Sequence, residues 1–271
     1  MSGIELTGVP ATMLLTLYYR ASEAARPDTV LSDPRAVRVL EEADFPFRER
    51  LGPPRNAQFV ALRCKCFDAA VTEFLAAHPE GTVVSLGEGL ETQFWRVDNG
   101  RARWLTVDLP ESMAVREKVL PVESGRQRQL ACSALDFTWC DAVDASRGVL
   151  IVVQGVLPYL RPPEVRTLLS TCAQRFPGGS IVFDTVSRRM GEMARRNWNR
   201  KHDLPMPEFH WTVEATDQQR LATADPNIVE VRDRPMPAGR GLLGRWLMPA
   251  LGLLSPGGRA AMVTQLYFGR G

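Results

Sequence analysis

The chain has 271 residues, of which 45% are apolar and 24% are charged, and its formal net charge is only +2. These values are ordinary for a globular protein, and the length allows one α/β domain with a large core. The near-balance of charge gives no reason to expect nucleic acid or an acidic membrane as a partner.

The first part of the chain predicts helices. MLLTLYYRASEAAR from Met13 has helical apolar spacing, and Ser32-Asp33-Pro34 is typical of an N-cap with proline in the first turn, opening a second helix through Leu40. The stretch EEADFPFRERLGPPRN is rich in proline and charge, which favours a loop that connects the helices or covers the substrate side. Residues 1–56 are therefore expected to form a helical cap and lid.

A long helix is expected next, because apolar residues and one arginine recur on one face at steps of three and four: Phe59, Val60, Arg63, Phe67, Ala70, Val71 and Phe74. Beyond it, short apolar runs alternate with helical stretches. The runs are TVVSL from Thr82, RWLTVDLP from Arg103, RQLACSA from Arg128, GVLIVVQG from Gly148 and SIVFDTV from Ser180. This alternation predicts a doubly wound α/β sheet with right-handed crossovers.

After Val186 the pattern loosens into a charged helix over about 188–201, the proline-rich HDLPMPEFHW, and two strands, NIVEVRDRPM and AMVTQLYFG. GLLGRWLMPALGLL from Gly241 is too short and too interrupted to span a bilayer, so we interpret it as a buried or lid-like helix. We expect one domain over 1–271, with the sheet in 57–271 and a substrate-side insertion at about 188–226.

The cysteines and the N-terminal residues indicate in which cellular compartment the protein is expected. The cysteines are odd in number (five), Cys64-x-Cys66 is not a metal spacing, and the three histidines form no ligand pattern near them. The N-terminal MSGIELTGVP has no pattern of a secretory signal. We therefore expect reduced thiols, no metal site and a cytoplasmic protein.

The stretch TVVSLGEGLETQF sets Gly87 and Gly89 in a turn directly after a strand. A P-loop would need lysine and then serine or threonine after the glycines, and a dinucleotide fingerprint would need a third glycine where Thr92 stands. Glu88 and Glu91 would also repel a phosphate at the helix N-terminus. A phosphate ligand is therefore not expected, and a tight turn without a ligand is the alternative.

The end of the second strand points to a ribose. Asp108 lies 21 residues after Gly87, which is the spacing of an acid that receives a ribose diol, although it can also act as the N-cap before Pro110. An adenosine without phosphates fits both features. S-adenosylmethionine is such a ligand, because its sulfonium and ammonium tolerate nearby acids while its carboxylate needs a cationic partner.

The chain resembles the leucine carboxyl methyltransferase-like family of S-adenosylmethionine-dependent enzymes, and within it the bacterial polyketide O-methyltransferases of the tetracenomycin type. The resemblance extends to about Arg189 and rests on YYRASEAARPDTVLSDPRA, the Arg63–Asp68 segment, VVSLGEGLETQFWRV, TVDLP, SALDFTW, QGVLPYL and PGGSIVFD. It implies a class I methyltransferase fold, with seven strands of which the last is antiparallel.

The resemblance also implies roles for single residues. Arg63 would pair with the cofactor carboxylate, Asp108 would receive the ribose, and Asp136 with Phe137 would lie against the adenine. The full cofactor-binding set is Arg20, Arg63, Gly87, Glu88, Gly89, Asp108, Leu109, Asp136, Phe137, Gln154 and Gly155. Arg20 would be a second carboxylate contact, and the glycines would let the backbone approach the methionine portion.

Two positions depart from the family pattern. Glu91 stands where the family usually has aspartate, and Gln154 stands where it usually has a glutamate that holds the cofactor ammonium. We expect weaker cofactor binding, with Glu88 supplying part of the missing charge.

The expected reaction is O-methylation of a carboxylate on a small polyketide-like or aromatic acceptor. A carboxylate is already ionised at neutral pH, whereas a phenol does better with a general base. Candidates for substrate contact or catalysis are His202, His210 and Tyr18, and the expected acceptor wall is Tyr18, Tyr19, Trp198, His202, Phe209 and Trp211. A phenolic O-methyltransferase, a protein C-terminal carboxyl methyltransferase, a non-catalytic cofactor-binding protein and a nicotinamide oxidoreductase are the alternatives, and a homodimer stays open.

Overall fold

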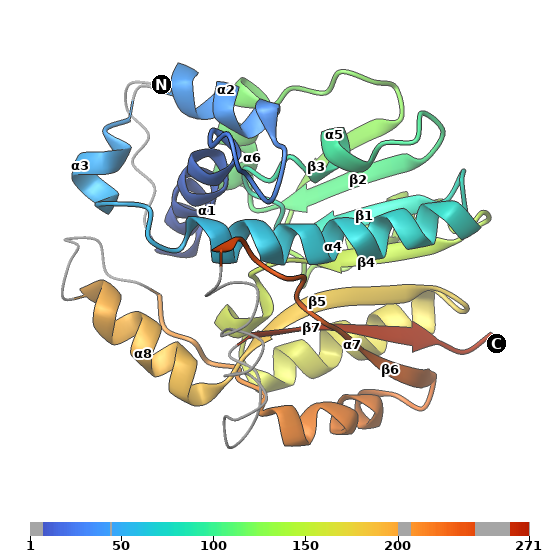
Figure 1. Ribbon diagram of the computed structural model, residues 1–271. Coiled ribbons are helices and arrows are strands. Elements are labelled where there is room, and N and C mark those ends of the chain that lie inside the picture. The colour runs from blue at the N-terminus through green and yellow to red at the C-terminus, as the bar shows by residue number, and fades with distance from the viewer. Residues whose placement is uncertain (1–7, 44, 200–206, 242–260, 271) are drawn as a thin grey trace.

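The computed structural model describes residues 8–43, 45–199, 207–241 and 261–270 (Figure 1). Within them one sheet has the strand order β3-β2-β1-β4-β5-β7-β6. The strands are β1 (Thr82–Leu86), β2 (Arg103–Asp108), β3 (Gln127–Ala131), β4 (Val149–Val153), β5 (Ser180–Val186), β6 (Ile228–Arg234) and β7 (Ala261–Phe268). Neighbouring strands from β3 to β5 pair in parallel, whereas β7 is antiparallel to both β5 and β6. The predicted seven-stranded sheet with an antiparallel last strand is confirmed.

The helices of the described residues are α1 (Gly8–Ala24), α2 (Pro34–Glu42), α3 (Phe47–Leu51), α4 (Ala57–Ala77), α5 (Gln93–Val97), α6 (Pro110–Val119), α7 (Pro162–Arg175) and α8 (Arg188–Asn199), with 3₁₀ helices η1 (Thr138–Ala142), η2 (Leu157–Tyr159) and η3 (Ala215–Ala224). The predicted start of α2 is confirmed, because the Asp33 carboxylate accepts the Ala36 N–H at 3.0 Å and Pro34 occupies the first turn.

The central strands are buried on both faces, as their uninterrupted apolar sequences predict. In β4, Ile151 and Val153 face a core with α7, while Leu150 and Val152 face a core with α4. This alternation follows from the two-residue period of a strand. Helices therefore cover both faces of the sheet. A ligand can reach the sheet at the carboxyl ends of its parallel strands.

The cap helices α1, α2 and α3 lie together at one end of the sheet, beside the first turns of α4 (Figure 1). The stretch predicted as a loop before α4 contains α3, because Phe47 and Leu51 bury their side chains in the cap core. The Tyr18 hydroxyl also donates to the Gly52 carbonyl at 3.1 Å. The segment is thus anchored by packing and by a hydrogen bond.

The C-terminal part follows its prediction in α8, β6 and β7, whereas η3 was not expected from the sequence. The stretch GLLGRWLMPALGLL, for which a buried or lid-like helix is expected, lies almost entirely outside the described residues. None of the helices in the described part has the length and apolarity that a membrane crossing requires.

A buried set of ion pairs joins the cap to the loop after β1. We call it the cap network: Arg20, Asp33, Asp68, Glu91 and Arg96. The Arg20 guanidinium donates to Asp33 at 2.8 Å and to Glu91 at 3.0 Å. Arg96 donates to the same two carboxylates at 2.8 and 2.7 Å, and it also pairs with Asp68 at 2.7 Å.

We expect Arg20→Ala to lower the free energy of unfolding by about 3–5 kcal/mol, because it leaves buried carboxylates without a cation. Arg26→Ala is the matched control, since Arg26 pairs with Asp28 on the surface with both side chains about half exposed, and it should leave stability nearly unchanged. Urea unfolding measures both. Equal effects of the two changes would contradict a structural role for the network.

Candidate functional site

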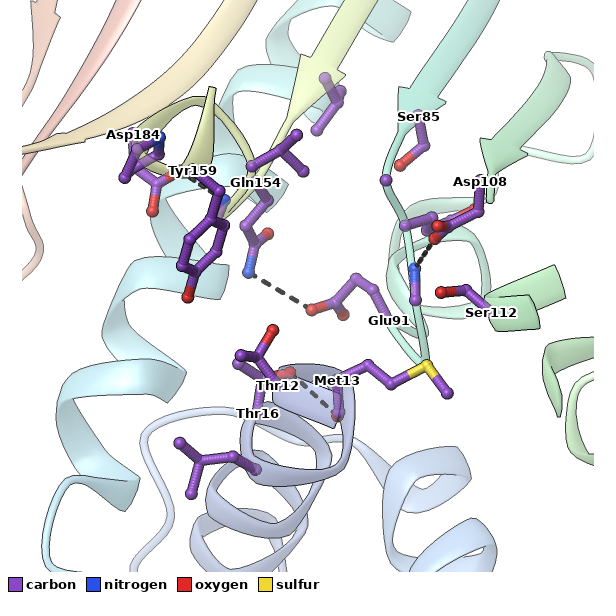
Figure 2. A pocket seen from close by; sticks show the side chains of 18 of the residues that line it. Thr12, Met13, Thr16, Ser85, Glu91, Asp108, Ser112, Gln154, Tyr159 and Asp184 are labelled. Atoms are coloured by element: carbon purple, nitrogen blue, oxygen red, sulfur yellow. Dashed lines mark hydrogen bonds between the residues drawn. The ribbon is translucent and has the colours of Figure 1, made fainter. Parts of the chain in front are cut away.

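A cavity of about 420 Å³ lies at the carboxyl ends of the parallel strands. Its walls come from α1, the start of α4, the loops after β1 to β4 and the end of β5. The strand order reverses between β1 and β4, and the crevice at such a reversal is where open α/β sheets bind ligands. Figure 2 shows Gln154, Tyr159 and Asp184 on one side of this pocket and Asp108 and Ser112 on the other.

Most of the predicted cofactor-binding residues line this cavity: Arg63, Gly87, Glu88, Gly89, Asp108, Leu109, Gln154 and Gly155. Arg20, Asp136 and Phe137 are not among the lining residues. The structure thus brings together residues that are far apart in the sequence, from α4 to the turn after β4.

The glycine turn after β1 brings the backbone to the cavity. Gly87 and Gly89 have φ of +63° and +51°, a conformation that L side chains rarely adopt. A Cβ on Gly87 would lie 2.4 Å from Cγ2 of Val156, and one on Gly89 would lie 2.9 Å from Cβ of Met13. Both positions therefore require glycine for conformation and for space.

Glu88 lies under this turn. Its carboxylate accepts from the Thr106 hydroxyl, from Nε1 of Trp104 at 3.2 Å and from Arg116 at 3.2 Å, and its side chain is fully buried. Burial raises the pKa of Glu88, and Arg116 opposes that shift. The Glu88 carboxylate is thus committed beneath the loop, which differs from the predicted role of supplying charge to the ligand.

Both glutamates of the loop are lining residues, and the carboxylate of Glu91 is directed toward Gln154 in the pocket (Figure 2). Burial opposes its ionisation, but Arg20 and Arg96 outweigh burial and hold the pKa of Glu91 well below its usual range. Because the folded-state pKa is depressed, this pairing stabilises the fold above the unfolded-state pKa, and the contribution is lost as the pH falls through the folded-state pKa.

Gln154, which the family resemblance places next to the cofactor ammonium, lies beside Glu91. Its Nε2 is directed at Glu91 at 3.4 Å and at Sγ of Cys64 at 3.2 Å, while its buried Oε1 has no hydrogen-bond partner among the described residues. The amide therefore offers an unused acceptor at the pocket wall.

Arg63 enters the cavity from α4. One guanidinium nitrogen donates to Asp184 at 2.7 Å, whereas its buried Nε has no partner among the described residues. The sequence predicts that the face of α4 with Phe59, Arg63 and Phe67 points inward. Phe67 is fully buried, as this predicts. Phe59 is 37% exposed and lines the cavity.

Asp108 ends β2 at the opposite side of the cavity. Its two carboxylate oxygens accept the N–H groups of Gly89 at 2.6 Å and Leu109 at 2.8 Å. Burial raises the pKa of Asp108, and these two backbone donors oppose the shift. Ser112 also hydrogen-bonds to this carboxylate, and a carboxylate with about four lone pairs can still receive a further hydroxyl.

The loop after β3 contributes Ser133, Ala134 and Leu135 to the cavity, one to three residues before the pair predicted against an adenine. Asp136 is exposed, and Phe137 has a left-handed backbone with φ of +59° and packs on the core. The loop after β3 therefore reaches the cavity as predicted, but it does so through Ser133 to Leu135 and not through Asp136 and Phe137.

Arg20 does not reach the cavity. Besides its two carboxylate partners, it donates to the Leu90 carbonyl at 2.6 Å, and only 1% of the residue is exposed. With all of these contacts made inside the protein, Arg20 is placed to hold the loop in position, and not to contact a ligand carboxylate as predicted.

The predicted acceptor wall is found in part. Tyr19 and Phe209 line the cavity, whereas Tyr18 is buried against Phe47 and is not a lining residue. Trp211 packs in the core near Phe183, and His210 is exposed and outside the lining. His202 and the side chain of Trp198 lie outside the described part of the chain.

Tyr159 and Asp184 are among the lining residues that were not predicted individually. Tyr159 packs against Phe209 with ring centroids 5.3 Å apart and ring planes tilted by 35°, and burial raises the pKa of its phenol. Both lie in stretches that carry the family resemblance, QGVLPYL and PGGSIVFD, and Asp184 stands near the carboxyl end of β5. The position of ligand sites at strand ends was the signal that could have identified Asp184.

No group of three or more histidine, cysteine, aspartate or glutamate side chains in the described residues is placed to hold a metal ion. The cavity residues are instead suited to an organic ligand with separated charges.

The sequence profile of leucine carboxyl methyltransferases matches residues 13–173. The tetracenomycin polyketide synthesis O-methyltransferase TcmP of Streptomyces glaucescens is 32% identical over 184 residues, which are 68% of this chain and 68% of the relative. The S-adenosyl-L-methionine-dependent methyltransferase dpfgK of Gibberella zeae is 25% identical over 244 residues, 83% of this chain and 81% of the relative.

Solved structures agree in fold. An O-methyltransferase family protein of Burkholderia thailandensis has a TM-score of 0.50 at 15% identity, over 96% of this chain and 72% of that one. A Thermobifida fusca protein, whose assignment as a methyltransferase is itself inferred, has a TM-score of 0.55 at 17% identity, over 93% and 94% of the two chains.

We expect Gly87→Ala to weaken binding of S-adenosylhomocysteine by at least tenfold, because the new methyl group meets Val156 in the pocket wall. Gly100→Ala is the matched control: Gly100 also has a positive φ, +77°, but nothing lies within 4 Å of its added Cβ. Both changes cost about 1–2 kcal/mol of stability from the left-handed backbone. Calorimetric titration separates them, and normal affinity in Gly87→Ala would contradict the close approach of ligand and loop.

Proposed function

The chain belongs to the leucine carboxyl methyltransferase family and is an S-adenosylmethionine-dependent methyltransferase, and we propose that it methylates a carboxylate of a small, largely apolar acceptor. The relative TcmP is named for polyketide synthesis, so a polyketide-like aromatic acid is the proposed acceptor class. The cofactor supplies a methyl group bound to a positively charged sulfur.

The amino-acid end of this cofactor fits the unused hydrogen-bonding groups of the pocket. The unpartnered Nε of Arg63 is a donor for a carboxylate, and the unpartnered Oε1 of Gln154 is an acceptor for an ammonium. Glu91 provides the negative charge beside Gln154 and so offsets the missing carboxylate at that position. We propose that Gln154 and Glu91 together receive the ammonium.

The adenosine end fits the other side of the cavity. Asp108, with Ser112 hydrogen-bonded to it, would receive the ribose hydroxyls. The backbone of Gly87 and Gly89 would approach the methionine portion, and Ser133 to Leu135 would lie along the adenine. These groups bind and orient the cofactor, and such positioning can supply about 7–11 kcal/mol of the barrier to an in-line transfer.

The acceptor would lie against the aromatic part of the wall. Tyr159 and Phe209 form a tilted aromatic pair, and Tyr19, Phe59 and Leu160 line the same cavity. Flat apolar molecules pack well against such rings, and their close contact excludes water from the reacting atoms.

The single observation that carries the carboxylate assignment is that three acidic or phenolic lining residues, Glu91, Asp184 and Tyr159, are each unsuited to act as a general base. Glu91 is a poor base because its pKa is depressed, and both oxygens of Asp184 are occupied by Arg63 and the Gly155 N–H. Tyr159 has a raised pKa and so stays protonated, which makes it a donor. A nucleophile that arrives already ionised suits this site, and a carboxylate is such a nucleophile.

A phenolic acceptor is the second candidate. His210 directly follows Phe209, which lines the cavity, so a small movement of this segment would bring an imidazole toward the acceptor. The two candidates differ in their product and in their pH dependence.

We expect the product formed from an aromatic acid and labelled S-adenosylmethionine to be a methyl ester that mild alkali hydrolyses. The control acceptor is the same ring system bearing a phenol in place of the carboxyl group. An alkali-stable methyl ether as the main product would contradict carboxylate methylation.

We also expect kcat/KM to be nearly constant between about pH 6 and pH 9, because a carboxyl group, which in water titrates at about pH 4, is ionised throughout that range. Initial rates with the aromatic acid measure this profile. A rate that rises with pH through this range would favour the phenol, which in water titrates at about pH 10.

A further inference from the structure

We propose that Asp184 is a positioning residue that orients the Arg63 guanidinium for the carboxylate of the cofactor. The inference rests on the proposed function, in which Arg63 pairs with that carboxylate. It assigns to the acid of β5 a function in cofactor recognition without direct contact to the ligand.

Asp184 is itself held rigidly. It lies in β5, where it pairs with Val263 of β7, and only 3% of the residue is exposed. Its two carboxylate oxygens have different partners: one accepts the Arg63 guanidinium at 2.7 Å, and the other accepts the Gly155 N–H at 2.6 Å. One carboxylate therefore ties together α4, β5 and the turn after β4.

Gly155 lies close to the guanidinium, nearest to the nitrogen that Asp184 holds. Its φ is +72°, and a Cβ built on it would lie 3.3 Å from Nη1 of Arg63, the nitrogen that donates to Asp184. The guanidinium thus rests against a bare backbone, and Asp184 fixes both that backbone and the guanidinium.

The attachment leaves one edge of Arg63 for a ligand. Asp184 uses the Nη1 nitrogen, whereas the buried Nε has no partner among the described residues. Carboxylates bind guanidinium groups most strongly through two parallel hydrogen bonds, so the orientation of the planar group matters as much as its charge. By holding one end, Asp184 sets the direction in which the remaining donors point.

Asp184 also carries a negative charge, which on its own would repel an incoming carboxylate. The two effects predict opposite results when the charge is removed without a change of shape. If orientation dominates, as we propose, the affinity for the cofactor falls; if repulsion dominates, it rises.

The test is Asp184→Asn, with binding of S-adenosylhomocysteine compared with binding of 5′-methylthioadenosine, which lacks the amino-acid portion. We expect the affinity for S-adenosylhomocysteine to fall about tenfold and the affinity for 5′-methylthioadenosine to stay within about twofold. Asp225→Asn is the matched control, because Asp225 is 4% exposed, accepts hydrogen bonds from Ser170, Gln174 and the Asn227 N–H, and lies outside the cavity lining.

A double-mutant cycle with Arg63→Ala tests whether Asp184 acts on cofactor affinity through Arg63. In that background Asp184→Asn should cause no further loss of S-adenosylhomocysteine binding, because the group it orients is gone. Unchanged or tighter binding in the single Asp184→Asn variant overturns the inference. So does an equal loss for both ligands, which would indicate a structural role only.

Gly155→Ala gives an independent route if Asp184→Asn does not fold. Its methyl group would lie 3.3 Å from Nη1 of Arg63, so the guanidinium must shift by a few tenths of an ångström while every charge stays in place. The same selective loss of S-adenosylhomocysteine binding is expected, and a normal affinity overturns the inference. The proposed acceptor chemistry can fail separately: an ether product would remove carboxylate methylation and leave these binding results unaffected.

Discussion

The structure depends on the charge balance of the cap network. Arg20 and Arg96 are the two guanidinium groups shared by Asp33, Asp68 and Glu91, and every member is largely buried. Such a set is stable only when its geometry satisfies each charge, so it fixes the cap and the glycine loop relative to each other. Two guanidiniums against three carboxylates leave one negative charge in excess, and Glu91 is the member that both accepts from each guanidinium and lines the cavity.

Sequence patterns were sufficient for the sheet. The apolar runs, the glycine turn and the antiparallel last strand follow from local periodicity and from turn chemistry, which depend on neighbouring residues, together with the family resemblance. Pocket residues at or just after the end of a strand, such as Gly87, Asp108 and Gln154, were also predictable, because the strands themselves were. Arg63 was predictable because its helix face and the family resemblance agree.

Side-chain partners were not predictable in the same way. Glu88 and Glu91 are three residues apart in one loop, yet one carboxylate points under the loop to Arg116 and the other toward the cavity. Arg20 carries the same charge as Arg63, but its guanidinium donates to Asp33, Glu91 and the Leu90 carbonyl inside the protein. These outcomes depend on residues from distant segments, such as Asp33 and Arg96, and no local pattern contains that information.

The pocket is lined by two kinds of residue, charged and aromatic. Arg63, Glu91 and Asp108 belong to buried hydrogen-bonded sets, whereas Phe59 and Phe209 have only apolar side-chain atoms to present to the cavity. Substitution of an aromatic residue alters shape and packing but leaves no buried charge unpaired. The acceptor range of such a scaffold can therefore diversify, in evolution or in engineering, while the machinery that holds the methyl donor stays unchanged.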